Sequence, residues 1–320
     1  MLCLNASDIE KAVSPAELIE AMVGAMVRYE QKEFFMPQRT HLDFAGNTLL
    51  LMPCFSQKSF ATKLVSLFPN NRAKNRQVLY GTVILNDGQT GEPLAIFNGA
   101  KLTAMRTGAV GGAAARYLTP VNVSSLGLFG AGVQAFHQAL FACAERPITD
   151  IYLFDPFSKK LDQFIKELSK QLRHVAIHRA GSAEEALSSS ALVITATNAR
   201  TPVLPDSKEL LANKYIIGIG SYKPDMREFP QSLFHLVNRY VLDTKHAQRE
   251  SGDVIEPLKN GWIKKGQLTT LGRVILEKQT SADNPPTLFK SVGMAAFDLV
   301  AADLVYQKAL ENKIGIDVNL

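Results

Sequence analysis

The chain of 320 residues contains little cysteine and no long hydrophobic run. Its three cysteines, Cys3, Cys54 and Cys143, form neither a CxxC pair nor a metal-binding spacing, so we expect reduced thiols and no metal site. No apolar stretch approaches the roughly 18 residues that a membrane-spanning helix needs, which excludes an integral membrane protein. Because Asp8 and Glu10 interrupt the first residues, we expect no secretory signal peptide and a cytoplasmic protein.

Blocks of basic residues and several common catalytic motifs are missing as well. The 35 Lys and Arg residues against 30 Asp and Glu give a net charge of +5, and they are scattered along the chain. This pattern favours a mildly basic solvated surface over nucleic-acid binding, and it would suit a small anionic ligand equally well. The sequence has no GxxxxGK phosphate loop, no GxSxG elbow and no HExxH zinc motif.

The first part of the chain reads as an α+β domain. Ser14 is placed to cap a helix whose first residue is Pro15, and apolar residues then recur at helical spacing. From Thr48 to Ala95 the pattern changes to strands, with the turn NDGQTGEP between the last two. A helix of small residues is predicted over Leu102–Tyr117. We therefore expect a mainly antiparallel or mixed sheet.

From Val123 onward, short apolar strands alternate with helical patterns of 10–15 residues. This alternation is typical of βαβ units and predicts a doubly wound parallel sheet. We expect the last helix, over Met294–Leu310, to return and pack on the first domain. The predicted strands are SSLGLFG, DIYLFD, HVAIHR, ALVITAT, KYIIGIGS and RYVLDT. The predicted division is an α+β domain of residues 1–118 with 297–320 and a nucleotide-binding domain of residues 119–296.

One segment carries the signature of a dinucleotide-binding loop. GAGVQA, which begins at Gly130, has the form G-x-G-x-x-A and lies between a predicted strand and a predicted helix. Gly130 would permit the tight turn, and Gly132 would let the backbone approach a pyrophosphate at the helix N-terminus. The alternative is a glycine turn in a nucleotide-free domain. The candidate cofactor-binding residues of this loop are Gly130, Gly132, Val133 and Gln134.

Asp155 ends the second strand of this domain and bears on the choice of cofactor. A carboxylate at this point accepts hydrogen bonds from ribose hydroxyls and repels a 2′-phosphate, which favours NADH over NADPH. Lys159 and Lys160 follow closely and could weaken that preference, so NADPH stays open.

A second group of candidates could bind an anion. Arg39, Lys63 and Arg106 would together bind a substrate carboxylate well, although each alone could be a surface charge. Lys63 lies in an apolar strand, where burial would require a partner or a ligand. Arg106 is expected at a loop-to-helix junction. Asp225 follows a predicted strand and is a candidate proton donor or acceptor, although it could equally cap a turn after Pro224.

Together these segments resemble the ornithine cyclodeaminase/mu-crystallin family. The resemblance covers residues 36–306 and rests on the stretches LLLMP, TKLVSLFPNN, LNDGQTGEPLAI, GAKLTAMRTGA, LGLFGAGVQA, GSYKPDMREF, ESGD and FKSVGMAAFD. It implies a Rossmann domain with a bound nicotinamide cofactor, and an N-terminal domain that binds substrate and forms a homodimer.

The resemblance also assigns roles to single residues. It implies that Arg39, Lys63 and Arg106 hold the substrate carboxylate, and that Asp225 is the acid/base residue. We take Lys63 and Asp225 as the catalytic pair. The further residues that it places near the cofactor are Thr107 and Gly108 at the phosphates, Val292 and Gly293 at the nicotinamide, and Asp155 at the ribose.

One departure from the family pattern bears on the substrate. Ornithine cyclodeaminases of this family carry a glutamate two residues before the Met-Pro pair, where this chain has Leu50. An ammonium placed beside an aliphatic side chain without a partner costs several kcal/mol, roughly, which argues against a diamine substrate. We expect an NAD(P)H-dependent reductase of cyclic ketimine carboxylates. The alternatives are an ornithine cyclodeaminase, an open-chain amino-acid dehydrogenase of the alanine type, and a non-catalytic NAD(P)H-binding protein.

Overall fold

The computed structural model describes residues 1–74, 76–279 and 286–319. The chain divides into two compact units: unit 1 is Met1–Arg106 with Met294–Leu320, and unit 2 is Thr107–Gly293. The sequence placed the boundaries after residues 118 and 296, whereas the contacts divide the chain after Arg106 and Gly293. The first of these boundaries falls inside helix α3 (Gly99–Leu118).

Unit 1 is built on a seven-stranded sheet in the order β15-β1-β6-β5-β4-β3-β2. Strand β1 pairs in parallel with β6, and the other neighbouring pairs are antiparallel, so the expected mixed sheet is present. Its strands are β1 (Leu2–Leu4), β2 (Thr40–Phe44), β3 (Asn47–Phe55), β4 (Ser59–Leu67), β5 (Leu79–Asp87), β6 (Pro93–Asn98) and β15 (Ile316–Asp317). The sequence predicted β3 to β6, whereas β1, β2 and β15 were not anticipated.

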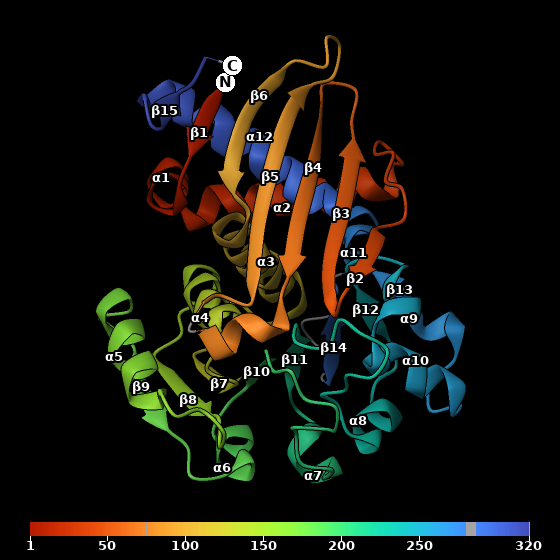
Figure 1. Cartoon of the computed structure of the whole chain (residues 1–320). Coiled ribbons are helices and arrows are strands. Elements are labelled where there is room, and N and C mark those ends of the chain that lie inside the picture. Colours follow the sequence, from red (N-terminus) through yellow and green to blue (C-terminus); the bar gives the residue numbers. More distant parts are fainter. Residues whose placement is uncertain (75, 280–285, 320) are drawn as a thin grey trace. The chain divides into compact units, whose positions relative to one another are not determined.

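Helices cover one face of this sheet. The helices of unit 1 are α1 (Ala6–Ala12), α2 (Pro15–Glu30) and α12 (Ala295–Asn312), with a 3-10 turn η1 (Pro69–Lys74). The predicted cap of α2 is confirmed, because the Ser14 side chain accepts from the Glu17 backbone N–H and Glu17 reaches back to Ser14. Helix α12 packs on α2, β3, β4 and β5, as expected of a returning helix. Figure 1 shows α12 and α2 on one side of β3–β6.

Unit 2 contains an eight-stranded parallel sheet in the order β13-β12-β14-β11-β10-β7-β8-β9. Its strands are β7 (Ser125–Phe129), β8 (Asp150–Phe154), β9 (Ala176–Arg179), β10 (Leu192–Thr195), β11 (Tyr215–Gly218), β12 (Tyr240–Leu242), β13 (Leu268–Thr270) and β14 (Thr287–Lys290). The chain runs outward from β7 through β8 to β9, then returns to the other side of β7 at β10. This reversal is the topological switch point, where doubly wound sheets bind their ligands.

Helices connect these strands, and a Rossmann-type α/β fold is therefore present as predicted. They are α4 (Val133–Glu145), α5 (Leu161–Gln171), α6 (Ala183–Ser188), α7 (Lys208–Leu211), α8 (Gln231–Leu236), α9 (Ala247–Glu250), α10 (Gly252–Lys259) and α11 (Leu271–Leu276), with a 3-10 turn η2 (Lys265–Gln267). The sequence predicted α4, α5 and α6, and it missed the short helices α7 to α11. Within the described residues, no helix combines the length and the apolar character that crossing a membrane requires.

Candidate functional site

The glycine loop of unit 2 lies between β7 and α4, at the switch point of the sheet. Gly130 has a φ of 104°, and a Cβ atom there would lie 2.7 Å from the carbonyl oxygen of Ala196. Only glycine meets both conditions without strain. Gly132 is the N-cap of α4, with φ −96° and ψ −176°, and a Cβ atom there would meet nothing within 4 Å. The positive φ of Gly130 agrees with the predicted turn, and the approach of a pyrophosphate to Gly132 stays a prediction.

The residues around this loop fit a dinucleotide. The space over Gly132 faces the N-terminus of the 13-residue helix α4, whose first N–H groups and dipole favour an anion. Val133 at its start is exposed, and the Oε1 atom of Gln134 is buried without a hydrogen-bond partner among the described residues. An open cradle with an unused buried acceptor suits the pyrophosphate and ribose of a nicotinamide cofactor.

Asp155 supports the glycine loop from the end of β8. Its Oδ2 atom accepts from the backbone N–H of Ala131 at 2.9 Å, and its Oδ1 atom accepts from Phe157 and Ser158 at 3.0 Å each. The carboxylate thus lies beside the loop and fixes the loop's shape. Its part in choosing between NADH and NADPH stays a prediction.

Thr107 and Gly108 lie inside helix α3. The carbonyl of Thr107 accepts from Gln138 Nε2 at 2.8 Å, and a Cβ atom on Gly108 would lie 2.6 Å from the Phe141 ring. Gly108 therefore lets α3 pack closely against α4, and its place near the cofactor phosphates stays a prediction. The expected loop-to-helix junction at Arg106 is wrong. Helix α3 begins at Gly99, where Asn98 accepts from the Lys101 backbone N–H and starts the helix earlier.

Asp225 lies on the segment that follows β11. Its side chain is exposed and forms an ion pair with Arg200, with 3.3 Å between Oδ2 and Nη2. The place after a parallel strand agrees with the sequence, and the role as acid or base stays a prediction.

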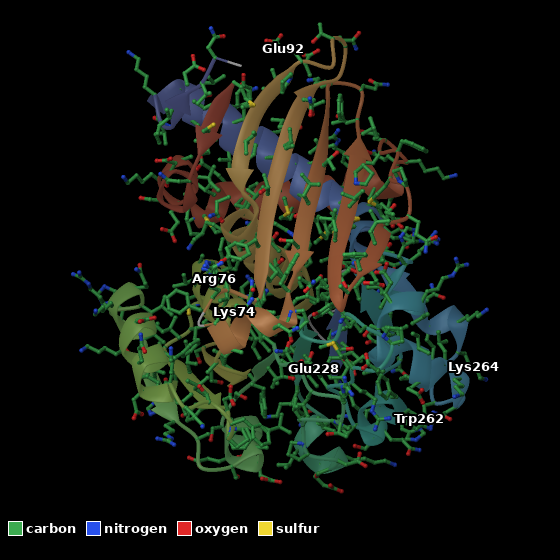
Figure 2. All side chains as sticks on the ribbon, viewed as in Figure 1. Lys74, Arg76, Glu92, Glu228, Trp262 and Lys264 are labelled. Carbon is green, nitrogen blue, oxygen red and sulfur yellow. The ribbon has the colours of Figure 1, made fainter. Side chains whose placement is uncertain are left out.

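A buried charge cluster, which the sequence analysis missed, supports this same segment. The Glu228 carboxylate accepts from the Thr197 backbone N–H and hydroxyl, both at 2.8 Å, and from the backbone N–H groups of Gly220 and Ser221 at 2.8 and 3.1 Å. It therefore ties together the segments that follow β10 and β11 in unit 2, where Figure 2 labels it. The fully buried Nζ of Lys290 lies 3.5 Å from this carboxylate.

Asp253 completes the cluster. Its Oδ2 lies 3.3 Å from Lys290 Nζ, and its Oδ1 accepts from the backbone N–H groups of Glu228 and Phe229 at 2.8 and 3.0 Å. Burial raises the pKa of Asp253, and the Lys290 charge opposes that rise. A lysine within the apolar run TLFKSVG was the available signal, because a charge buried there requires partners.

Val292 and Gly293, predicted near the nicotinamide, follow β14. Their backbone N–H groups donate to Asp243 Oδ2 at 2.9 and 2.7 Å, and the Ser291 hydroxyl donates to the same atom at 2.7 Å. Asp243 therefore fixes the path of this segment, and the nicotinamide contact stays a prediction.

The second candidate site lies in unit 1 and centres on Lys63. Alternate residues of β4 are buried, and Lys63 belongs to this buried row, with only 4% of its side chain exposed. Its register partners on the neighbouring strands are Met52 and Val83, so apolar residues flank it on both sides within the sheet. Leu50 shares this face of the sheet, since it pairs with Val65, two residues along β4.

Asp298 of helix α12 is the partner that this buried ammonium requires. Lys63 Nζ donates to Asp298 Oδ2 at 2.6 Å, and Arg106 Nε donates to Asp298 Oδ1 at 3.0 Å. All three side chains are buried. The sequence analysis missed Asp298, although an aspartate within the apolar segment AAFDLV was a signal of the same kind as Lys63.

Lys63 and Arg106 meet at Asp298, and the charge of Arg39 also acts on Lys63. Burial lowers the pKa of Lys63 to about 8; Asp298 raises it, while the charges of Arg106 and the half-buried Arg39 lower it. Asp298 itself has a lowered pKa: burial would raise it, but the charges of Arg106 and Lys63 outweigh that effect. The result is a preformed cationic cluster that could bind one carboxylate. Among the described residues, no group of His, Cys, Asp and Glu side chains could hold a metal ion.

One known protein family matches nearly the whole chain. The model of the ornithine cyclodeaminase/mu-crystallin family matches residues 1–313. The chain belongs to this family.

Three individual proteins are each similar to this chain over nearly its whole length. The chain is 33% identical over 323 residues to Delta(1)-pyrroline-2-carboxylate reductase of Bacillus cereus (strain ZK / E33L), covering 98% of each protein. The structure of the Thermococcus litoralis Delta(1)-pyrroline-2-carboxylate reductase in complex with NADH and L-proline superposes with a TM-score of 0.91, at 35% identity, over 99% of this chain and 100% of that one. An archaeal alanine dehydrogenase dimer with bound NAD gives a TM-score of 0.88 at 27% identity, covering 100% and 99%.

Proposed function

We propose that this family member is an NADH-dependent reductase of cyclic ketimine carboxylates. The leading reaction is Δ1-pyrroline-2-carboxylate to L-proline, with Δ1-piperideine-2-carboxylate to L-pipecolate beside it. The observation that carries the proposal is the buried pair of cations, Lys63 of β4 and Arg106 of α3, joined by Asp298. Leu50 lies on the same face of the sheet as Lys63. The named reaction of the Bacillus cereus relative, and the NADH and L-proline in the Thermococcus litoralis structure, support it.

Residues of unit 1 are assigned to the substrate carboxylate, and residues of unit 2 to the cofactor and the proton. Lys63 and Arg106, with Arg39, would hold the substrate carboxylate and so orient the ring carbon that is reduced. The glycine loop and the N-terminus of α4 would hold the cofactor pyrophosphate, and Asp155 the ribose. When bound, NADH supplies the hydride. Asp225 would hold or deliver the proton on the imine nitrogen, because a protonated imine accepts hydride more readily.

Leu50 favours an apolar ring over a diamine. A distal ammonium that met Leu50, Met52 and Val65 would lose its hydration without gaining a carboxylate partner. A five- or six-membered ring has no such charge and packs against aliphatic side chains. Asp155 favours NADH, since its carboxylate repels a 2′-phosphate.

We also propose that the protein is a cytoplasmic homodimer. The face of the unit 1 sheet turned away from α12 carries exposed or half-buried apolar side chains, a pattern that marks an interaction surface. These residues are Leu42, Phe44, Leu49, Leu51, Phe55, Phe60, Leu64, Tyr80, Ile84 and Ile96. The archaeal alanine dehydrogenase in the comparison is a dimer.

The test is NADH oxidation followed at 340 nm with Δ1-pyrroline-2-carboxylate, beside an assay of ammonia release from ornithine. We expect oxidation without ammonia release, and a much weaker reaction with pyruvate plus ammonia. Ammonia release from ornithine without net NADH change would replace the proposal with a cyclodeaminase. A preference for pyruvate plus ammonia would replace it with an alanine-type dehydrogenase, and tight NADH binding without any turnover with a binding protein.

A variant tests the proton donor separately. Asp225→Asn should abolish turnover and leave NADH binding close to that of the wild type. Turnover near the wild-type rate would remove Asp225 from the mechanism while leaving the substrate assignment in place.

A further inference from the structure

Asp298 is a buried carboxylate that the proposed reaction does not use directly. It lies between the two cations to which the proposed function assigns the substrate carboxylate, at 2.6 Å from Lys63 Nζ and 3.0 Å from Arg106 Nε. Its own side chain is 2% exposed, and it occupies the first turn of α12, where the helix dipole favours a negative charge.

Lys63, Arg106 and Asp298 form a buried trio whose summed charge favours the binding of one anion. Lys63 and Arg106 contribute two positive charges and Asp298 one negative charge, so the trio keeps one net positive charge. Asp298 takes the Nε–H of Arg106 and one donor of Lys63, which leaves the Nη groups of Arg106 and two ammonium hydrogens outside these contacts. A carboxylate can use donors of this kind.

We propose that Asp298 is the positioning residue of the carboxylate-binding site, which keeps Lys63 charged and fixes the orientation of Arg106. This inference rests on the proposed function and deepens it. A buried ammonium in an apolar strand tends to lose its proton, and the neighbouring guanidinium groups add to that tendency. Asp298 opposes both effects, so the site stays ready to bind an anion at neutral pH.

The groups that face this site agree with that role. Burial, Arg106 and Arg39 all lower the pKa of Lys63, whereas Asp298 raises it, and the balance is a pKa of about 8. The Cys54 thiol of β3 also faces Asp298; its pKa is raised to about 12, mainly by burial, so it stays uncharged. Without Asp298, burial and the charges of Arg106 and Arg39 would all favour the neutral form of Lys63.

The experiment compares Asp298→Asn with Asp303→Asn. Asp303 is a matched control, because it lies on the same helix and accepts from the Ser59 hydroxyl of the same strand β4 at 2.7 Å. Each purified protein is assayed for kcat and KM with Δ1-pyrroline-2-carboxylate between pH 6 and 9. Binding of L-proline to the enzyme–NADH complex is measured by calorimetry over the same range.

We expect Asp298→Asn to raise KM and the L-proline Kd at pH 7.5 by about 10- to 100-fold, with a smaller effect on kcat. The alkaline limb of kcat/KM should move about 1–3 pH units lower, because an opposite charge at this distance shifts a pKa by that amount. Asp303→Asn should keep the wild-type profile. A profile of Asp298→Asn that coincides with that of Asp303→Asn would overturn the inference while the wild-type activity upheld the proposed function.

A measurement on the wild type decides the question if Asp298→Asn does not fold. Binding of L-proline should take up about one proton at pH 8.5, when Lys63 must recover its charge, and almost none at pH 6.5. The uptake is measured by calorimetry in buffers of different ionisation enthalpy. Uptake of about one proton already at pH 6.5 would overturn the role of Asp298, because Lys63 would then be neutral before the ligand binds despite that carboxylate. A wild type that neither turns over the imine nor binds L-proline would overturn the proposed function, and this inference with it.

Discussion

Gly132→Ala separates cofactor binding from folding more sharply than other changes in the glycine loop. The added Cβ atom meets nothing of the protein within 4 Å, and φ −96° with ψ −176° is an ordinary conformation for alanine. The methyl group would instead occupy the space over the N-terminus of α4. The substitution should therefore obstruct a bound pyrophosphate and change the stability of the cofactor-free protein little.

The expected sizes differ enough to be measured. Exchanging glycine for alanine at an N-cap costs about 0.5–1 kcal/mol of stability. Loss of one hydrogen bond to a charged group costs about 1.5–3 kcal/mol, which corresponds to roughly a 10- to 100-fold weaker cofactor. Gly130→Ala should have the opposite effect, with a larger loss of stability than of cofactor affinity. Its φ of 104° would strain an alanine by about 1–3 kcal/mol, and its Cβ would contact the Ala196 carbonyl, so this variant should mainly lose stability.

The assay is a titration with NADH followed by fluorescence, together with thermal unfolding without cofactor. Gly132→Ala should show a raised Kd for NADH and a melting temperature close to that of the wild type. Gly130→Ala should show a clearly lowered melting temperature. An unchanged NADH Kd in Gly132→Ala would refute the assignment of the pyrophosphate to this helix N-terminus.

Three further predictions concern buried charges. Arg146→Met should lower the free energy of unfolding by roughly 2–4 kcal/mol in a urea titration, because the buried guanidinium donates to the last carbonyls of α3; a loss below 1 kcal/mol would contradict this. Lys290→Met should cost about 3–5 kcal/mol at pH 8 and less at pH 5, since Asp253, whose pKa is already raised, can then take up a proton; an equal loss at both pH values would contradict it. The pKa of Lys63 is lowered from 10.5 to about 8, so the folded state binds fewer protons than the unfolded state between these values. Wild-type stability relative to Lys63→Met should therefore rise between pH 8 and 10.5, by up to roughly 3 kcal/mol, while anion binding falls; a flat difference would refute the lowered pKa.

Much of unit 2 was predictable from local pattern. The strands around GAGVQA are short apolar runs, and the glycine spacing carries its own geometric reason in the φ of Gly130. The order of the remaining strands was not predictable. Strand β14 lies between β11 and β12 in the sheet, although it follows β13 in the chain, and no local pattern encodes that insertion.

The errors in unit 1 have local causes. Strand β2 is exposed along its whole length, so it lacks the alternation by which β4 was recognised. Helix α3 begins at Gly99 because Asn98 caps it, although Gly and Ala at its start gave no periodic signal. The junction assigned to Arg106 did not fit even the helix predicted from Leu102, and Arg106 lies inside α3.

The partners of buried charges could not be predicted, because they are distant in sequence. Lys63 and Asp298 are separated by 235 residues, and Lys290 meets carboxylates from two different segments. The sequence nevertheless indicated one member of each buried ion pair, since both lysines interrupt apolar strands. Burying an ammonium costs stability unless a carboxylate compensates, so a lysine in such a strand predicts a partner before the partner is known.

The two clusters differ in their balance of charge. In unit 1 the partner of the lysine is one aspartate shared by two cations, which leaves positive charge for a ligand. In unit 2 two carboxylates share one lysine, and this surplus of negative charge is absorbed by the backbone N–H groups that shape the segments after β10 and β11. Under the proposed function, the balance of charge thus distinguishes the carboxylate-binding cluster of unit 1 from the structural cluster of unit 2.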